Sequence, residues 1–544
     1  MHTVITKNWF SFVILLVYMG TVLCFFPLTY GINDDAAILW DIQSGHMVSF
    51  MSILLGNLLS FCYRNISSNI PWFSLTLYTF LGISIYCVII STWKFTKNNH
   101  LLIPVLVIFL ALCLKPLIHI SYNMVSISLA SGSLLSLWIY LEKADKKRFL
   151  IVILMGICFS FSYHIRMDGI KATLCFTALP LLLFFFRIRK CCRHLLLFLI
   201  PLAITIPANH FYENSLATES DVQYREWNTL RGQFHGFSVE LLNADNEQIR
   251  KANNWSKNDY LMLTNWMYLD ENKFNISSLK NVFKYAFPPP ALPYRLLSAK
   301  GYFIDFVQTY PIYLCILLFI ALLGFWTLNG YSRIMPIIYL VYILTGAITM
   351  HIFFRFPGRI GFPILLNCIP WMAFMVFNHN SSRLNNYGRI LTIFSFFLFT
   401  FFTCIVLYGF CINARNTRLN QINQYKSIQE LEAMQGNLFL IPAQNVFYQV
   451  LNPLHNHRFT FKTIPCGWPI YSPLFYKALR ENGMKHAYEL LPKIAQNKNC
   501  YIVGNNEDIT LISEYLKETF HIHIKVVLVK QLSNHLIVFR IEAI

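Results

Sequence analysis

The sequence predicts an α-helical polytopic membrane protein of about eleven transmembrane helices, followed by a small α/β domain at the carboxyl terminus. Three observations support this fold class. Apolar windows of about 17 to 25 residues recur along the chain, the length that crosses a hydrocarbon core of about 30 Å. Charged residues make up 13% of the 544 residues, whereas soluble domains carry about 25%. Most Lys and Arg residues lie in short clusters between the windows, as the positive-inside rule describes.

The apolar windows are separated by short polar loops over much of the chain. They lie at residues 10–29, 71–93, 101–118, 122–141, 149–165, 168–186, 194–209, 309–328, 333–353, 360–378 and 388–411. Lys7 precedes the first window, and no small-residue cleavage pattern follows it. We therefore expect an uncleaved first helix rather than a signal peptide.

The basic loops predict the orientation of the chain. Clusters within 94–97, 143–148, 187–193 and 383–389 fall on one side of the membrane only if the amino terminus is cytoplasmic, and the odd number of windows then places the carboxyl terminus outside. The net charge of +18 thus reflects topology. We expect membrane lipids as partners and no nucleic acid.

The segments between and after the windows complete the predicted architecture. Residues 36–64 mix apolar and polar side chains, which favours helices lying in the membrane interface. Residues 210–308 form a large, aromatic-rich outer loop, so that residues 1–411 make up the transmembrane domain. Residues 412–544 have the composition of an extracytoplasmic α/β domain, with strands predicted at 438–442, 500–504, 524–530 and 535–541 and helices near 473–482 and 508–519. The sequence does not decide whether Cys466 and Cys500 form a disulfide.

An acidic pair, Asp34 and Asp35, directly follows the first apolar window. Charge at this depth loses hydration unless it faces water, a cation or a substrate. One alternative is structural, because Asn33 and Asp34 could cap a helix beginning near Ala36. The functional interpretation makes Asp34 a general base, with Asp35 orienting the acceptor or holding a divalent cation such as Mg or Mn. No cofactor is certain from these residues.

Two turns on the same predicted face carry cationic groups. The turn 164–168 contains His164, Arg166 and Asp168, where a structural ion pair between Arg166 and Asp168 is the alternative to function. The turn 353–359 places Arg355 and Arg359 around a Pro-Gly kink. Planar guanidinium groups match phosphate oxygens, so we expect Arg355, Arg359, Arg166 and His164 to bind a donor phosphate.

The outer loop provides candidates for recognising an acceptor. Arg231, His235 and Trp266 lie in this loop, and together with Asp168 they suit a sugar or polyol. The simplest reaction that uses carboxylates, guanidinium groups and a polar lid transfers a sugar from a polyprenyl-phosphate donor to an acceptor hydroxyl, with inversion by general-base catalysis. The expected partners are a polyprenyl-phosphate-linked sugar and a glycan, lipid or protein acceptor. The expected location is a bacterial inner (cytoplasmic) membrane, from the Ile, Lys and Asn-rich usage, or the ER membrane in a eukaryote.

At these residues the chain resembles the GT-C superfamily of polytopic glycosyltransferases that use polyprenyl-phosphate sugars. The resemblance lies in an acidic pair directly after the first span, interface helices, a large outer loop and a soluble outer carboxy-terminal domain. Protein mannosyltransferases and lipid A aminoarabinose transferases have Asp-Glu where this chain has Asp34-Asp35, and the first acidic residue is the catalytic one, which implies that role for Asp34. The Trp-Trp-Asp motif of the oligosaccharyltransferases is absent. The chain also resembles a group of uncharacterised bacterial multi-span proteins with an Asn-Asp-Asp loop and an Arg-Phe-Pro turn.

Three other functions compete with sugar transfer from a lipid phosphate. An O-antigen polymerase or ligase would rely on Arg225, Arg231 and His235 of the large loop, so that replacing Asp34 would have little effect. A lipid or oligosaccharide transporter would carry its ionisable groups at mid-span, whereas here they gather at one face. A non-enzymatic assembly factor would bind no polyprenyl phosphate.

Overall fold

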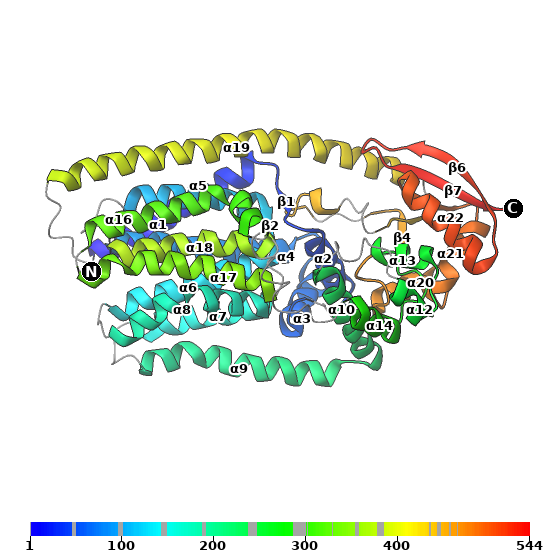
Figure 1. Cartoon of the computed structure of the whole chain (residues 1–544), viewed down its shortest axis with the longest axis horizontal. Coiled ribbons are helices and arrows are strands. Elements are labelled where there is room, and N and C mark those ends of the chain that lie inside the picture. The colour runs from blue at the N-terminus through cyan, green and yellow to red at the C-terminus, as the bar shows by residue number, and fades with distance from the viewer. Residues whose placement is uncertain are drawn as a thin grey trace.

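The computed structural model consists of a long helical bundle that carries a smaller α/β unit at one end (Figure 1). It describes residues 2–45, 50–95, 102–142, 149–187, 192–237, 247–286, 301, 303–328, 330–353, 358–377, 386–434, 437–442, 448–455, 459–464 and 466–544. We call the end of the bundle next to the α/β unit the site end.

Within the described residues the bundle contains eleven helices, each of which falls on one of the predicted apolar windows. They are α1 (His2–Phe25), α4 (Trp72–Phe95), α5 (Leu102–Ile118), α6 (Tyr122–Glu142), α7 (Phe149–Ile165), α8 (Met167–Arg187), α9 (Cys192–Leu216), α16 (Pro311–Thr327), α17 (Met335–Phe353), α18 (Gly358–Phe377) and α19 (Asn386–Glu432). The central helices are α6 and α18, whose apolar windows are each 89% buried. Apolar helices of this kind fit a polytopic membrane protein.

Not every bundle helix is long enough to count as a span by itself. Among the described residues, six helices are long and apolar enough to cross a membrane, or seven if the bent pair 303–309 and 311–327 forms one span. The helices at 9–25, 102–118 and 149–165 are apolar but shorter. The number of spans and their orientation therefore stay predictions, and the basic loop 143–148 lies outside the described residues.

Short elements close the site end of the bundle. Helix α2 (Asn33–Ser44), helix α3 (Ile53–Phe61) and the π-helix η1 (Cys62–Ile66) occupy the segment where interface helices were predicted. Strands β1 (Thr29–Tyr30) and β2 (His119–Ile120) pair in parallel. A Cβ atom at Gly31 would lie 2.8 Å from the Ser121 Cβ, so only glycine allows this close approach. The strand pair thereby holds the start of α2 against the start of α6.

The α/β unit contains a five-stranded sheet with the order β4-β3-β5-β7-β6. Strands β3, β4 and β5 are parallel, and β6 and β7 complete the sheet in antiparallel fashion. The bounds are β3 (Leu438–Leu440), β4 (Lys462–Ile464), β5 (Cys500–Gly504), β6 (Ile524–Gln531), β7 (Ile537–Ala543), α20 (Pro473–Glu481), α21 (Leu490–Gln496) and α22 (Asn506–Phe520), with 3-10 helices η3 (Gly330–Arg333), η5 (Tyr448–Val450) and η6 (Ala487–Glu489). Cys466 and Cys500, whose disulfide the sequence left open, are both free.

The large loop packs onto this sheet unit rather than standing alone. Its helices are α10 (Glu219–Phe237), α12 (Glu247–Asn253), α13 (Lys257–Thr264) and α14 (Ile276–Ala286). Trp227 and Tyr268 from the loop share one buried apolar cluster with Phe475 and Ile502 from the carboxy-terminal unit. Helix α19 runs through the predicted domain boundary at 411/412 as a single helix and reaches the sheet (Figure 1).

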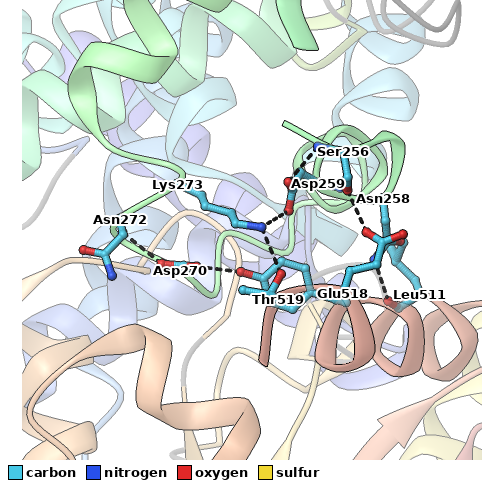
Figure 2. Close-up of polar contacts among 10 residues, drawn as sticks. Ser256, Asn258, Asp259, Asp270, Asn272, Lys273, Leu511, Glu518 and Thr519 are labelled. Carbon is cyan, nitrogen blue, oxygen red and sulfur yellow. Dashed lines mark hydrogen bonds and ion pairs between the residues drawn. The ribbon is translucent and has the colours of Figure 1, made fainter. Parts of the chain in front are cut away.

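Polar contacts also join the loop to α22, as Figure 2 shows. The Lys273 ammonium group lies 2.6 Å from a carboxylate oxygen of Asp259 and donates to the Thr519 hydroxyl at 2.9 Å. Asp259 is 2% exposed, and its other carboxylate oxygen caps α13 by accepting from the Ser256 amide at 2.9 Å. The Tyr515 hydroxyl donates to Asp270 at 2.7 Å. Because Asp259 is buried, its charge depends on Lys273 for compensation.

Replacing Lys273 by Met should loosen the loop from α22. Breaking an exposed ion pair costs about 0–1 kcal/mol of stability, and breaking a buried one costs about 3–5 kcal/mol. Only one partner of this pair is buried, so we expect the free energy of unfolding to fall by about 2 kcal/mol. Amide hydrogen exchange in α13 and α22 should then accelerate roughly 30-fold. The matched control is Lys280→Met, whose partner Glu226 is 49% exposed, and exchange that is equal in both variants would contradict the role of Lys273.

Candidate functional site

The central feature of the site end is an ion pair between Asp34 and Arg359. The Arg359 Nη1 atom donates to the Asp34 Oδ2 atom at 2.8 Å, across 325 residues of sequence. The side chains are 22% exposed for Asp34 and 28% for Arg359, so both remain accessible to a ligand. Asp34 was predicted as the general base and Arg359 as a phosphate ligand from separate parts of the sequence, and the structure brings these two side chains together.

Helix α2 presents Asp34 from its first turn. The helix begins at Asn33, with Ile32 in extended conformation before it. A carboxylate in the first turn also interacts favourably with the positive end of the helix dipole. Arg359 lies in the first turn of α18. The pair thus joins the beginnings of two helices at the site end.

Asp35 occupies a different environment from its neighbour. Its side chain is fully buried, and its two carboxylate oxygens accept backbone hydrogen bonds from Tyr122 at 2.8 Å and Ile32 at 3.2 Å. Burial raises the pKa of Asp35 to about 8, the Tyr122 amide opposes this increase, and the nearby Asp34 carboxylate adds to it. The carboxylate that caps α2 is therefore Asp35, whereas the sequence suggested Asn33 or Asp34.

The raised pKa of Asp35 predicts how stability depends on pH. Between the unfolded pKa near 4 and the folded pKa of about 8, the folded state binds the extra proton, so this contribution to stability is full at low pH and is lost as pH rises through about 8. We expect the unfolding temperature of the wild type to fall from pH 5 to pH 8 more steeply than that of Asp35→Asn. Parallel pH profiles of Tm for the two proteins would disprove this assignment.

Arg166 links the acidic pair to the turn between α7 and α8. It donates through Nη1 to the Tyr122 hydroxyl and through Nη2 to Asp168 at 3.4 Å. Tyr122 also interacts electrostatically with Asp34, Asp35 and Arg359. The buried Nε of Arg166 has no hydrogen-bond partner. The predicted ion pair of Arg166 with Asp168 thus exists, and Arg166 has in addition a contact toward the site.

Arg231 approaches the same charges from the loop side. Its guanidinium group donates twice to the Asn228 side-chain oxygen, at 2.7 and 3.0 Å, and lies 4.9 Å from the ring centre of Trp266. Burial lowers the pKa of Arg231 below its ordinary value, while nearby tyrosines and Asp34 act in the opposite direction. Arg231 therefore adds a buried positive charge within electrostatic range of Asp34 and Arg359.

The other predicted residues divide into two groups. His164 is buried, and its Nδ1 atom lies 2.8 Å from the Ser52 hydroxyl, a contact that ties α7 to the start of α3. Asp168 is 56% exposed and also lies 3.5 Å from Lys171. The turn around Arg355 lies outside the described residues, and so does the side chain of His235, whose backbone belongs to α10.

Both carboxylates of the acidic pair already have hydrogen-bond partners. The Asp34 carboxylate faces a guanidinium group, and the Asp35 carboxylate accepts backbone amides on both oxygens. Within the described part of the chain, no group of three His, Cys, Asp or Glu side chains could hold a metal. Divalent cations need several free oxygen ligands, so the guanidinium groups are the positive charges that this geometry offers.

Tyr122 and the β1–β2 strand pair could not be predicted from the sequence. Tyr122 supplies the amide that binds Asp35 and the hydroxyl that meets Arg166. Its only signal is its place at the start of an apolar window, which many tyrosines share. The two-residue strands are too short for any alternation pattern to reveal.

Comparisons with known proteins gave one structural likeness. No family model and no curated protein matches the chain. The crystal structure of ArnT from Cupriavidus metallidurans bound to undecaprenyl phosphate is similar over 97% of both chains, with 11% sequence identity and a TM-score of 0.41. Because this similarity is so low, the residues of the charged site are the basis for a function.

Proposed function

We propose that the protein is a membrane glycosyltransferase that moves a sugar from a polyprenyl-phosphate donor to an acceptor hydroxyl. The observation that supports this most directly is the accessible ion pair of Asp34 with Arg359 at the end of an apolar helical bundle. The carboxylate can accept a proton and the guanidinium group can bind a phosphate. A lipid tail would lie along the apolar helices, and the GT-C resemblance of the sequence favours a polyprenyl chain.

Donor binding would separate the ion pair. Asp34 occupies the oxygen position at Arg359 that a donor phosphate would take. A phosphate that binds Arg359 replaces this contact and leaves the Asp34 carboxylate to accept the acceptor proton. The ion pair thus holds both groups in position for the substrates that they would bind.

The two substrates and residues of this chain account for each bond, the proton and the leaving group of the reaction. The acceptor oxygen attacks the anomeric carbon, its proton passes to Asp34, and the bond from that carbon to the phosphate oxygen breaks. The electron pair leaves with polyprenyl phosphate, whose charge Arg359 and Arg231 stabilise. Attack opposite to the leaving group inverts the anomeric configuration. Asp35 acts as a positioning residue, because its two backbone hydrogen bonds fix the first turn of α2.

The proposal is tested with the purified full chain in lipid nanodiscs. A radiolabelled polyprenyl-phosphate hexose should be consumed in the presence of methyl hexosides, with release of polyprenyl phosphate and a product of inverted configuration. Saturating donor that yields no product with any acceptor, together with no binding of polyprenyl phosphate, would favour an assembly factor.

Metal dependence provides a further prediction. Because guanidinium groups take the place of a cation, we expect EDTA to change the transfer rate by less than about twofold. A loss of activity that Mg²⁺ or Mn²⁺ restores would show that a cation enters the site with the donor.

A further inference from the structure

A cavity of about 290 Å³ opens at the site end, and Arg166 is one of its lining residues. It lies between the segment leading into α3, the turn from α7 to α8, the end of α9 and the start of α10. Its ionisable lining residues are Arg166, Asp168, His210, Glu213, Asp221 and Arg225. The volume is near the lower end of about 300–1,000 Å³ that small-molecule sites occupy, so the cavity suits one compact ring.

The cations of this cavity are compensated by carboxylates. Arg225 forms an ion pair with Glu213, and Arg166 pairs with Asp168 at 3.4 Å. His210 lies 4.0 Å from Glu213. An anion such as a phosphate would have to break these pairs. The lining therefore favours a neutral ligand that both donates and accepts hydrogen bonds.

Aromatic side chains complete the walls. Phe50, Tyr163 and Tyr224 line the cavity together with the charged groups. Phe50 packs edge-on against Trp468, with ring centres 5.0 Å apart, and the Tyr224 hydroxyl donates to the Trp468 carbonyl at 2.9 Å. Phe50 and Tyr224 are held by these contacts. Aromatic rings in a cavity wall can pack against the C–H side of a sugar, while the charged pairs suit its hydroxyl groups.

Two routes connect the cavity with Asp34. On one side, Arg166 forms a wall of the cavity and donates to Tyr122, which lies within electrostatic range of Asp34. On the other side, Tyr224 lines the cavity and interacts with Arg231, which in turn interacts with Asp34 and Arg359. Arg166 therefore lies between the cavity and the residues around Asp34.

We propose that this cavity binds the acceptor as a neutral sugar ring, one of whose hydroxyl groups is directed toward Asp34. The assignment rests on the proposed transferase function and specifies its acceptor class. It places the acceptor between the α7–α8 turn and α10, whereas the sequence suggested Arg231 and Trp266 of the loop. Arg225 and Glu213 are the residues that we expect to determine acceptor specificity.

The test measures sugar and lipid binding separately on the full chain in nanodiscs. Saturation-transfer NMR with methyl hexosides and methyl hexosaminides reports on the cavity, and binding of undecaprenyl phosphate reports on Arg359. We expect Arg225→Gln and Glu213→Gln each to weaken binding of the best glycoside at least tenfold and to leave undecaprenyl phosphate binding within twofold. The control Lys251→Met, in an exposed pair with Glu247, should change neither.

The possible outcomes separate this inference from the proposed function. Glycoside binding that both Gln variants retain, or that undecaprenyl phosphate displaces competitively, would overturn the acceptor site and leave the transferase proposal standing. Absence of undecaprenyl phosphate binding in the wild type would contradict the transferase proposal itself. If Arg225→Gln fails to fold, Glu213→Gln alone decides, because it keeps the size of the side chain.

Discussion

Replacing Asp34 by Asn should reduce sugar transfer by about 10³-fold. A positioned general base contributes roughly 10²- to 10⁴-fold, and Asn has nearly the same shape but cannot accept the proton. Donor binding should become equal or tighter, because a phosphate no longer has to displace a carboxylate from Arg359. The measurement is the rate of polyprenyl-phosphate release at saturating donor, together with donor affinity in the absence of acceptor.

Slower sugar transfer together with equal or tighter donor binding distinguishes the loss of the base from a loss of folding. A misfolded Asp34→Asn variant would lose donor binding together with transfer, whereas loss of the base alone leaves binding intact. Glu226→Gln serves as the matched control, since it removes a carboxylate from an exposed pair with Lys280 and should change neither quantity. Transfer that survives in Asp34→Asn would eliminate the base and favour the polymerase or ligase interpretation based on the loop.

The helical part of the fold could be predicted because the membrane imposes a length. A helix must be apolar over about 20 residues to cross, and each predicted window holds a helix of the bundle. Strands β5 and β6 were found at nearly the predicted bounds because β-branched residues form continuous runs between turns. Strand β4, with only three residues, gives no such signal.

The site was only partly predictable for a related reason. Charges that are costly near a membrane point to function, which identified Asp34 and Arg359 before their contact was known. The family resemblance points to Asp34 as the base, but no pattern in the sequence shows that Asp34 is accessible and Asp35 is buried. That difference arises because the Tyr122 amide at the start of α6 binds Asp35. The roles of Tyr122 and of the cavity beside Arg166 likewise depend on contacts between distant helices.

Replacing Arg359 by Gln should weaken donor binding by about 10²-fold and lower kcat/KM by 10³-fold or more. A guanidinium group that binds the phosphate acts on the ground state, and the charge that develops on the leaving phosphate increases its effect in the transition state. The loss of the ion pair with Asp34 should cost the fold about 1 kcal/mol or less, because both partners are partly exposed. Arg359→Lys should fall between the wild type and Arg359→Gln, since it keeps the charge but not the planar geometry.

The double variant Asp34→Asn with Arg359→Gln separates the two functions of the pair. If the ion pair only stabilised the fold, each single variant would destabilise the protein and the double variant would cost little more than either, because one contact can be lost only once. If Arg359 binds the phosphate and Asp34 takes the proton, donor affinity in the double variant should match that of Arg359→Gln, and transfer should be at least as slow as in either single variant. Donor affinity that is unchanged in Arg359→Gln would remove the phosphate from this site, and the ion pair would then be a structural contact between α2 and α18.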